Sequence, residues 1–133
     1  MHAKTILELL VALEELQNAP AWRFNRNLRR NLREEPGVYV ISRIDQPMIA
    51  IRAGTTITAK DGLRQRVYKN QFMGDQKGNL RQQLVGDGVC ASMDETKAYI
   101  QNHLQVKVLV IADNEWRKRV ENFMLAVLNP KYP

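Results

Sequence analysis

Two strand-like segments separated by a short turn constrain the fold most strongly. Residues 38–44 (VYVISRI) and 48–53 (MIAIRA) are rich in β-branched and aromatic residues, which favour strands. The residues between them, Asp45, Gln46 and Pro47, are typical of a turn, so we expect an antiparallel hairpin. A third and more apolar segment, VKVLVIA at 106–112, comes late in the chain. The sequence therefore predicts a small sheet, mixed or antiparallel.

Helical patterns surround these strands. Leucine and isoleucine recur at spacings of three and four over residues 5–17, which predicts an amphipathic helix. Further helices are expected over 24–34, from Asp61 as an N-cap onward, over 78–86 and over 94–104. A last helix should begin at Asp113 or Asn114. Strands and helices in this order predict an α+β fold, a small sheet flanked by helices.

Composition excludes several classes of protein. The 133 residues include 44% hydrophobic and 26% charged side chains, as in a globular domain. No apolar run approaches the roughly 20 residues that span a bilayer, and an acidic residue interrupts the apolar N-terminal stretch, unlike a signal peptide. The lone Cys90 and the two histidines cannot build a cysteine-rich or histidine-rich metal site. We expect an intracellular, cytoplasmic protein with no membrane partner.

Phosphate-binding loops of the nucleotide-binding enzymes are absent from the sequence. The segment IRAGTT at 51–56 lacks the glycine spacing of a Walker or dinucleotide loop. No Gly-x-Ser-x-Gly elbow is present either. We therefore expect no small-molecule cofactor.

Basic residues exceed acidic ones by 20 to 14, for a net charge of +6, which favours a polyanionic partner. Four arginines lie on one face of the helix expected over 24–34, and a second basic group follows the hairpin. These residues are Arg26, Arg29, Arg30 and Arg33, then Arg52, Lys60, Arg64, Arg66, Lys69, Lys77 and Arg81. If both groups face the same side of the molecule, they would form a positively charged track that binds a phosphate backbone. The alternative is a solvated helix face, partly neutralised by Glu34 and Glu35.

Glu121 is the acidic residue of most interest. It follows Val120 and borders the apolar face of the last predicted helix. A carboxylate at such a boundary is poorly solvated and could hold a divalent ion. The alternative is an exposed glutamate paired with Arg117 or Lys118, four or three residues earlier.

Four segments stand in the order of known nuclease motifs. They are PGVYVI at 36–41, MIAIRAGTT at 48–56, LRQRVY at 63–68 and VENFMLAVLNPKY at 120–132. With these segments the chain resembles the GIY-YIG nuclease superfamily over residues 34–133, in a branch of small stand-alone nucleases and restriction enzymes. The resemblance implies a small three-stranded antiparallel sheet flanked by helices. Residues 1–33 would then be an N-terminal helical extension packed on the nuclease domain.

The same resemblance implies an activity and a set of site residues. Members of the superfamily are endonucleases that hydrolyse phosphodiester bonds of DNA with one divalent metal, here expected to be Mg²⁺ or Mn²⁺. Tyr39 would orient the attacking water, Arg66 would bind the scissile phosphate, and Glu121 would hold the metal. The substrate would be double-stranded DNA, contacted by the basic residues Arg26, Arg29, Arg30, Arg33, Arg64, Lys69 and Arg81. A homodimer would let two centres cut both strands.

The chain departs from the superfamily at several motif positions, among them Thr55 in place of a lysine and Pro133 in place of the closing asparagine. The second-motif tyrosine is missing: Arg52 takes its place if Gly54 is the motif glycine, and Ile49 does so in another alignment. In the first alignment Arg52 would join the catalytic residues as a positive charge beside Tyr39. The histidine or tyrosine expected one turn after Arg66 is Asn70 or Gln71.

Two alternatives to an active nuclease follow from the sequence. One is a catalytically degenerate module of the same fold that binds nucleic acid. The other is a protein-interaction subunit that offers the leucine face of residues 5–17 to another chain.

Overall fold

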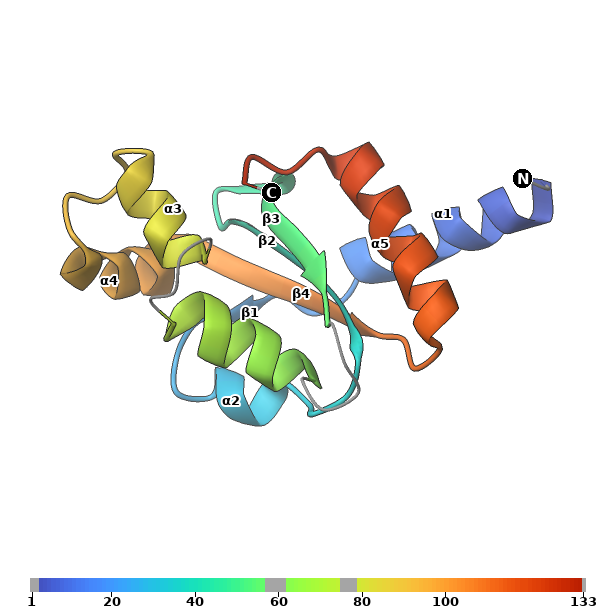
Figure 1. Ribbon diagram of the computed structural model, residues 1–133, viewed down its shortest axis with the longest axis horizontal. Helices are drawn as coiled ribbons and strands as arrows, with labels where there is room; N and C mark the ends of the chain where they lie inside the picture. Colours follow the sequence, from blue (N-terminus) through green and yellow to red (C-terminus); the bar gives the residue numbers. More distant parts are fainter. Residues whose placement is uncertain (1–2, 57–61, 75–78, 133) are drawn as a thin grey trace.

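A four-stranded antiparallel sheet organises the fold (Figure 1). The computed structural model describes residues 3–56, 62–74 and 79–132. The strands are β1 (Trp22–Arg23), β2 (Gly37–Arg43), β3 (Gln46–Thr55) and β4 (Leu104–Val110), in the order β1-β4-β2-β3. Every neighbouring pair of these strands is antiparallel. The α+β class, the hairpin and the late strand are confirmed.

The sheet has one strand more than the three that we expected. The additional strand, β1, contains two residues, and Trp22 pairs with Val106 of β4. Two residues are too few to show the alternation that identifies a strand in sequence. Phe24, Leu28 and Leu32, which follow β1, are fully buried in the core. The segment expected as an N-terminal extension thus contributes a strand and core residues to the fold.

Six helices lie in the described part of the chain. They are α1 (Ala3–Gln17), α2 (Leu28–Asn31), the π-helix η1 (Arg64–Phe72), α3 (Leu80–Gly86), α4 (Met93–His103) and α5 (Asn114–Leu128). The expected helices over 5–17, 78–86 and 94–104 are confirmed within a few residues at their ends. The expected N-cap Asp61 lies outside the described residues.

The helix expected over 24–34 is wrong in its length. Only the four residues of α2 are helical: residues 24–27 form bends and turns before it, and Leu32 takes an extended backbone conformation (φ −90°, ψ 133°) that ends it. The carbonyl of Leu32 then accepts a hydrogen bond from Arg64 Nε at 3.1 Å. Arg29 and Arg30 lie on α2, whereas Arg26 precedes it and Arg33 follows it. The four arginines therefore do not share one helix face.

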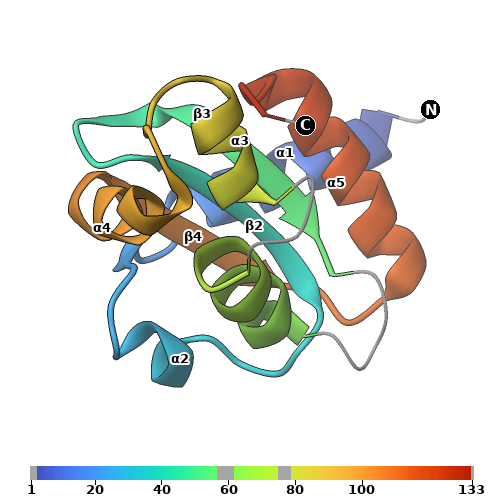
Figure 2. The same ribbon diagram turned by 60° about the vertical axis from the view of Figure 1, so that its left-hand side comes forward.

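Alternation along β2 separates two core clusters on the two faces of the sheet. Val38 packs with Leu13 of α1 and Met124 of α5 on one face. Tyr39 and Ile41 point to the other face and pack with residues of η1, α3 and α4. Figure 2 shows α1 and α5 together on one side of the sheet, with α3 and α4 on the other. The sheet separates the helices of its two faces, so a cavity lined by residues from both sets of helices must lie at an edge of the sheet.

The last helix leads the chain to that edge. Asp113, rather than Asn114, caps α5, and its side chain accepts a hydrogen bond from Trp116 N at 2.8 Å. The helix ends at Asn129 in the left-handed conformation (φ 44°). The chain then turns back, and Tyr132 N donates to Ile51 O at 2.8 Å. This contact extends the sheet beyond β3, its edge strand. No helix among the described residues is both long and apolar enough to cross a membrane.

Candidate active site

A cavity of about 370 Å³ lies at the β3 edge, between η1 and α5. Its described lining residues are Tyr39, Arg52, Ala53, Gly54, Arg66, Glu121, Leu125, Asn129 and Pro130. All four residues that we predicted as catalytic are among them. They come from β2, β3, η1 and α5, so only the tertiary fold brings them together.

The strand register places Tyr39 and Arg52 on the same face of the hairpin. Tyr39 pairs with Gly54, and Ile41 pairs with Arg52. A Cβ at position 54 would lie 2.8 Å from the Tyr39 hydroxyl oxygen, closer than real Cβ contacts. Glycine at this position is therefore what makes room for the tyrosine hydroxyl.

The Tyr39 hydroxyl is buried without a hydrogen-bond partner among the described residues. The whole residue has 0% exposure. A buried hydroxyl left without a partner costs about 1–3 kcal/mol. A hydrogen bond from a ligand atom or a water molecule at the cavity wall would remove that cost.

Two arginines bring positive charge to the cavity. Arg52 is 7% exposed, and its Nη1 donates a hydrogen bond to Gln83 Oε1 on α3. Arg66 is half-buried, and its Nε has no hydrogen-bond partner in the described part of the chain. Of the two candidates for the second-motif position, Arg52 lines the cavity, whereas Ile49 is 58% exposed and does not.

Glu121 is the acidic residue of the cavity. Burial raises the pKa of its carboxyl, and the positive charges of Arg66, Lys118 and Arg117 oppose that rise. No described cation forms an ion pair with it within 4 Å. Arg117 instead donates to the carbonyl of Ile111 at 3.0 Å and to Asn114 Oδ1. The alternative interpretation, in which Glu121 is exposed and paired with Arg117 or Lys118, is therefore wrong.

A metal in this cavity would have one protein carboxylate. Among the described residues there is no group of three or more His, Cys, Asp or Glu side chains that could enclose an ion. Mg²⁺ retains several waters and is commonly bound by one or two carboxylates together with substrate phosphates. The single carboxylate of Glu121 therefore fits a metal ion whose remaining ligands are water molecules and a substrate phosphate.

The seven basic residues predicted to contact the DNA duplex do not line the cavity and differ in exposure. Arg26, Arg29, Arg30 and Lys69 are exposed. Arg33 is exposed and pairs with Glu35 at 3.3 Å. Arg64 is held between Leu32 O and Glu34 Oε1, the latter at 3.3 Å. Because they are exposed, Arg26, Arg29, Arg30 and Lys69 are accessible to a phosphate backbone.

Arg81 differs from the other predicted phosphate contacts. It is 8% exposed, and its Nε donates to Thr96 Oγ1 at 2.7 Å. Its two terminal nitrogens donate to Met73 O and Met93 O, both at 3.1 Å. A guanidinium that is buried and engaged on all three nitrogens ties η1, α3 and α4 together, and we do not carry Arg81 into the proposed nucleic-acid interface.

Two residues of the cavity lining, and one residue that contacts Arg52 from outside it, were not identified from sequence. Gln83 lies in a short polar stretch of α3 with no motif around it, and no sequence signal indicates its contact with Arg52. Asn129 and Pro130 form part of the wall because the chain turns at Asn129. The helix-ending character of an Asn-Pro pair was the available signal.

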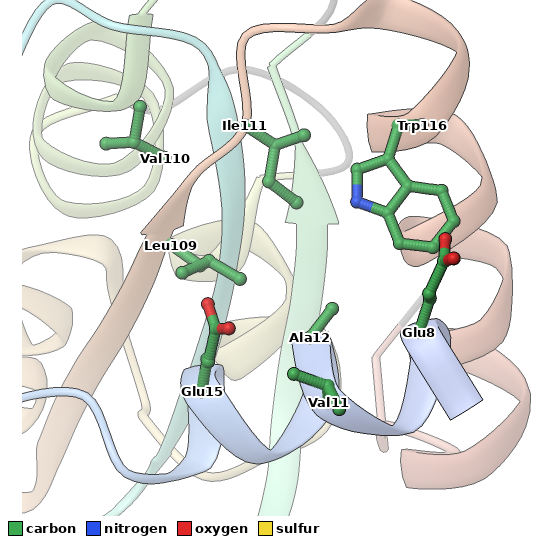
Figure 3. A pocket seen from close by; sticks show the side chains of 8 residues that line it. All are labelled: Glu8, Val11, Ala12, Glu15, Leu109, Val110, Ile111 and Trp116. Atoms are coloured by element: carbon green, nitrogen blue, oxygen red, sulfur yellow. The ribbon is translucent and has the colours of Figure 1, made fainter. Parts of the chain in front are cut away.

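A separate groove of about 220 Å³ lies between α1 and α5 (Figure 3). Leu109, Ile111 and Trp116 line it together with the acidic Glu8 and Glu15. Most of the leucine face of α1 packs inside the molecule, since Leu9, Leu13 and Leu16 are buried. Ile6 and Leu10 remain 43% and 48% exposed. The apolar face predicted to bind another chain is therefore largely used within this fold.

Comparison with solved structures finds two similar chains. Both are the GIY-YIG N-terminal endonuclease domain of UvrC from Thermotoga maritima, each a tyrosine-to-phenylalanine point mutant bound to its catalytic divalent cation. The TM-score is 0.46 for both, at 19% and 17% sequence identity, covering 100% of this chain and 98% of each of those chains. No family model and no curated protein matches the sequence.

Proposed function

We propose that this chain is a divalent-metal-dependent endonuclease of the GIY-YIG type that hydrolyses phosphodiester bonds of DNA. The observation that carries the proposal is the convergence of Tyr39, Arg52, Arg66 and Glu121 on one cavity. A tyrosine, two arginines and a carboxylate are suited to an anionic substrate that undergoes attack by water.

Each residue has a role that its chemistry supports. Tyr39, with its hydroxyl at the cavity wall, orients the attacking water by hydrogen bonding. Arg66 binds the scissile phosphate and offsets the negative charge that grows on it in the transition state. Arg52 adds a second positive charge in the position of the absent tyrosine. These contributions are electrostatic and geometric, so they do not depend on a histidine.

Glu121 would hold the divalent metal. A bound Mg²⁺ or Mn²⁺ supplies charge stabilisation to the phosphate and to the leaving oxygen. Partial burial of the Glu121 carboxyl raises its pKa, so a bound cation would stabilise the ionised form.

The exposed basic residues position the duplex. Arg26, Arg29, Arg30 and Arg33 surround α2, Lys69 follows Arg66 along η1, and Arg64 lies at the start of η1. Arginine contacts to phosphate fix the register of a duplex without reading its sequence. We expect a cytoplasmic protein that acts on double-stranded DNA, as a monomer or as a homodimer that cuts both strands.

A catalytically degenerate DNA-binding module is the second candidate. Arg52 in place of the second-motif tyrosine favours it, because a guanidinium cannot transfer a proton at neutral pH. This candidate keeps the same basic surface and the same cavity, but it does not cut DNA.

Supercoiled plasmid nicking tests the proposal. The purified protein is incubated with plasmid in Mg²⁺, Mn²⁺ or EDTA, beside Glu121→Ala and Arg66→Ala. We expect metal-dependent nicking that falls by at least about 100-fold in either variant, the size of effect seen when one transition-state interaction is removed. Exposed Asn122 on α5 provides the control Asn122→Ala, which should cut like the wild type.

The outcomes separate the two candidates. Salt-sensitive plasmid binding without nicking in any metal would support the degenerate module. Undiminished nicking by Glu121→Ala would remove Glu121 as the metal ligand. Circular dichroism and Tm of each variant establish that a loss of nicking is not a loss of folding.

A further inference from the structure

Arg52 is held by a helix that supplies no described residue to the cavity wall. Its Nη1 donates to Gln83 Oε1, and Gln83 lies half-buried in the middle of α3. The amide is neutral, so this hydrogen bond orients the guanidinium without cancelling its charge. A carboxylate at position 83 would orient Arg52 equally well and would neutralise it.

The same helix fastens the end of the chain. Asp87, four residues after Gln83 at the C-terminus of α3, accepts a hydrogen bond from the Tyr132 hydroxyl at 2.9 Å. Its carboxylate also pairs with Lys131 Nζ at 2.9 Å. These two contacts hold the pKa of the Asp87 carboxyl below its ordinary value. Residues 129–132, the C-terminal strap, are thereby tied to α3.

The C-terminal strap lies directly against the strand that carries Arg52. Tyr132 N donates to Ile51 O at 2.8 Å, and Tyr132 forms a parallel bridge with Arg52. Asn129 and Pro130, at the start of the strap, line the cavity. Gln83 and Asp87 therefore act on two parts of one wall, the guanidinium of Arg52 and the strap beside it.

We propose that α3 is the positioning element of the site, in which Gln83 orients Arg52 as a second cation for a substrate phosphate and Asp87 fastens the strap that walls the cavity. This inference rests on the proposed nuclease function. Gln83 and Asp87 are positioning residues that act through Arg52 and through the strap. The role is expected to be visible in kinetics, since a displacement of about 1 Å in a catalytic group can cost about 100-fold in rate.

Substitutions of Gln83 separate orientation from charge. Gln83→Leu keeps the size of the side chain but removes the acceptor, and we expect kcat to fall by about 10- to 100-fold. Gln83→Glu keeps an acceptor oxygen but neutralises Arg52, and we expect kcat to fall as it does in Gln83→Leu, with a raised KM in addition because the substrate phosphate loses a cation. Gln101→Leu makes the same chemical change at an exposed position of α4 and should change neither constant. A wild-type kcat in Gln83→Leu would overturn the proposal.

Nuclear magnetic resonance tests the inference without cleavage. The Nε–Hε signal of Arg52, assigned with Arg52→Lys, should shift when a short DNA duplex is added in EDTA. In Gln83→Leu we expect that shift to be strongly reduced, and in Gln101→Leu to be unchanged. A shift of wild-type size in Gln83→Leu would overturn the proposal. Should the wild-type protein bind DNA but not cut it, the nuclease function fails, and this measurement still decides the role of Gln83.

Hydrogen exchange tests the role of Asp87. Asp87→Ala removes the acceptor of both Tyr132 and Lys131, so the amide hydrogen of Tyr132, bonded to Ile51 O, should exchange at least about 10-fold faster. Nicking by this variant should fall while its Tm stays close to that of the wild type. Unchanged exchange and unchanged nicking would together show that Asp87 does not fasten the strap.

Discussion

The arginines around α2 and the arginines inside the fold have the same chemistry and opposite surroundings. Arg29 and Arg30 are exposed on a helix of four residues. Arg52, Arg81 and Arg117 are 7%, 8% and 4% exposed, and each donates hydrogen bonds to groups of the protein. The exposed group can meet a phosphate backbone at little cost, whereas burying a guanidinium costs free energy that hydrogen bonds within the protein must offset. A basic composition therefore indicates a polyanionic partner without indicating which arginines contact it.

The largest expected effect is a loss of stability when a buried arginine is replaced. Arg81→Met should lower the free energy of unfolding by about 2–3 kcal/mol, because Thr96 and the carbonyls of Met73 and Met93 lose a charged donor. For a chain of this size that loss corresponds to a fall in Tm of roughly 10 °C. Thermal unfolding measures it, and Arg29→Met, the same change on the exposed helix, should leave Tm within about 2 °C.

Duplex binding by the same variants completes this test. At a temperature where both are folded, Arg81→Met should bind a duplex as the wild type does, because its guanidinium is already engaged inside the protein. Weaker binding by folded Arg81→Met would show that the buried arginine contacts DNA after all.

A smaller effect is expected from the exposed group. Replacing Arg26, Arg29, Arg30 and Arg33 by alanine should weaken duplex binding and lower the slope of log K against log salt by about 0.9 for each phosphate that the protein no longer neutralises. Binding measured at several salt concentrations gives the slope, and Tm should hold because these side chains are exposed. An unchanged slope would mean that these residues are a solvated face, the alternative raised by Glu34 and Glu35.

The smallest effect concerns the carboxyl of the cavity. Burial raises the pKa of Glu121 in the folded state, so the ionised carboxylate lowers stability at neutral pH. Glu121→Gln should therefore be slightly more stable than the wild type at pH 7. The advantage should shrink as the pH falls through the folded pKa and vanish below the ordinary glutamate value of about 4.3, where both side chains are neutral. Tm measured between pH 3 and pH 8 tests this, with exposed Glu115→Gln as the control.

An excess stability of Glu121→Gln that does not change with pH would contradict this explanation. A stability gain at pH 7 combined with the loss of nicking would instead show that the fold retains a destabilising carboxylate for its activity.

Local patterns of the sequence determined the elements and the residue types of the site. The hairpin of β2 and β3, the helix α1 and the late strand β4 follow from hydrophobic periodicity and turn residues, which act between near neighbours. Tyr39, Arg66 and Glu121 could be named because they lie in recognisable motifs, and Arg52 because it replaces a motif residue. These residues do line one cavity.

Contacts between distant segments decided the rest. β1 exists because two residues pair with β4, the helix around Leu28 ends where Leu32 turns toward Arg64, and Arg81 is buried by three separate segments. The contact of Gln83 with Arg52, and the contacts of Asp87 with the C-terminal strap, join segments that are distant in the sequence. Such pairings are decided by which surfaces pack together after the elements have formed, and no local periodicity encodes them.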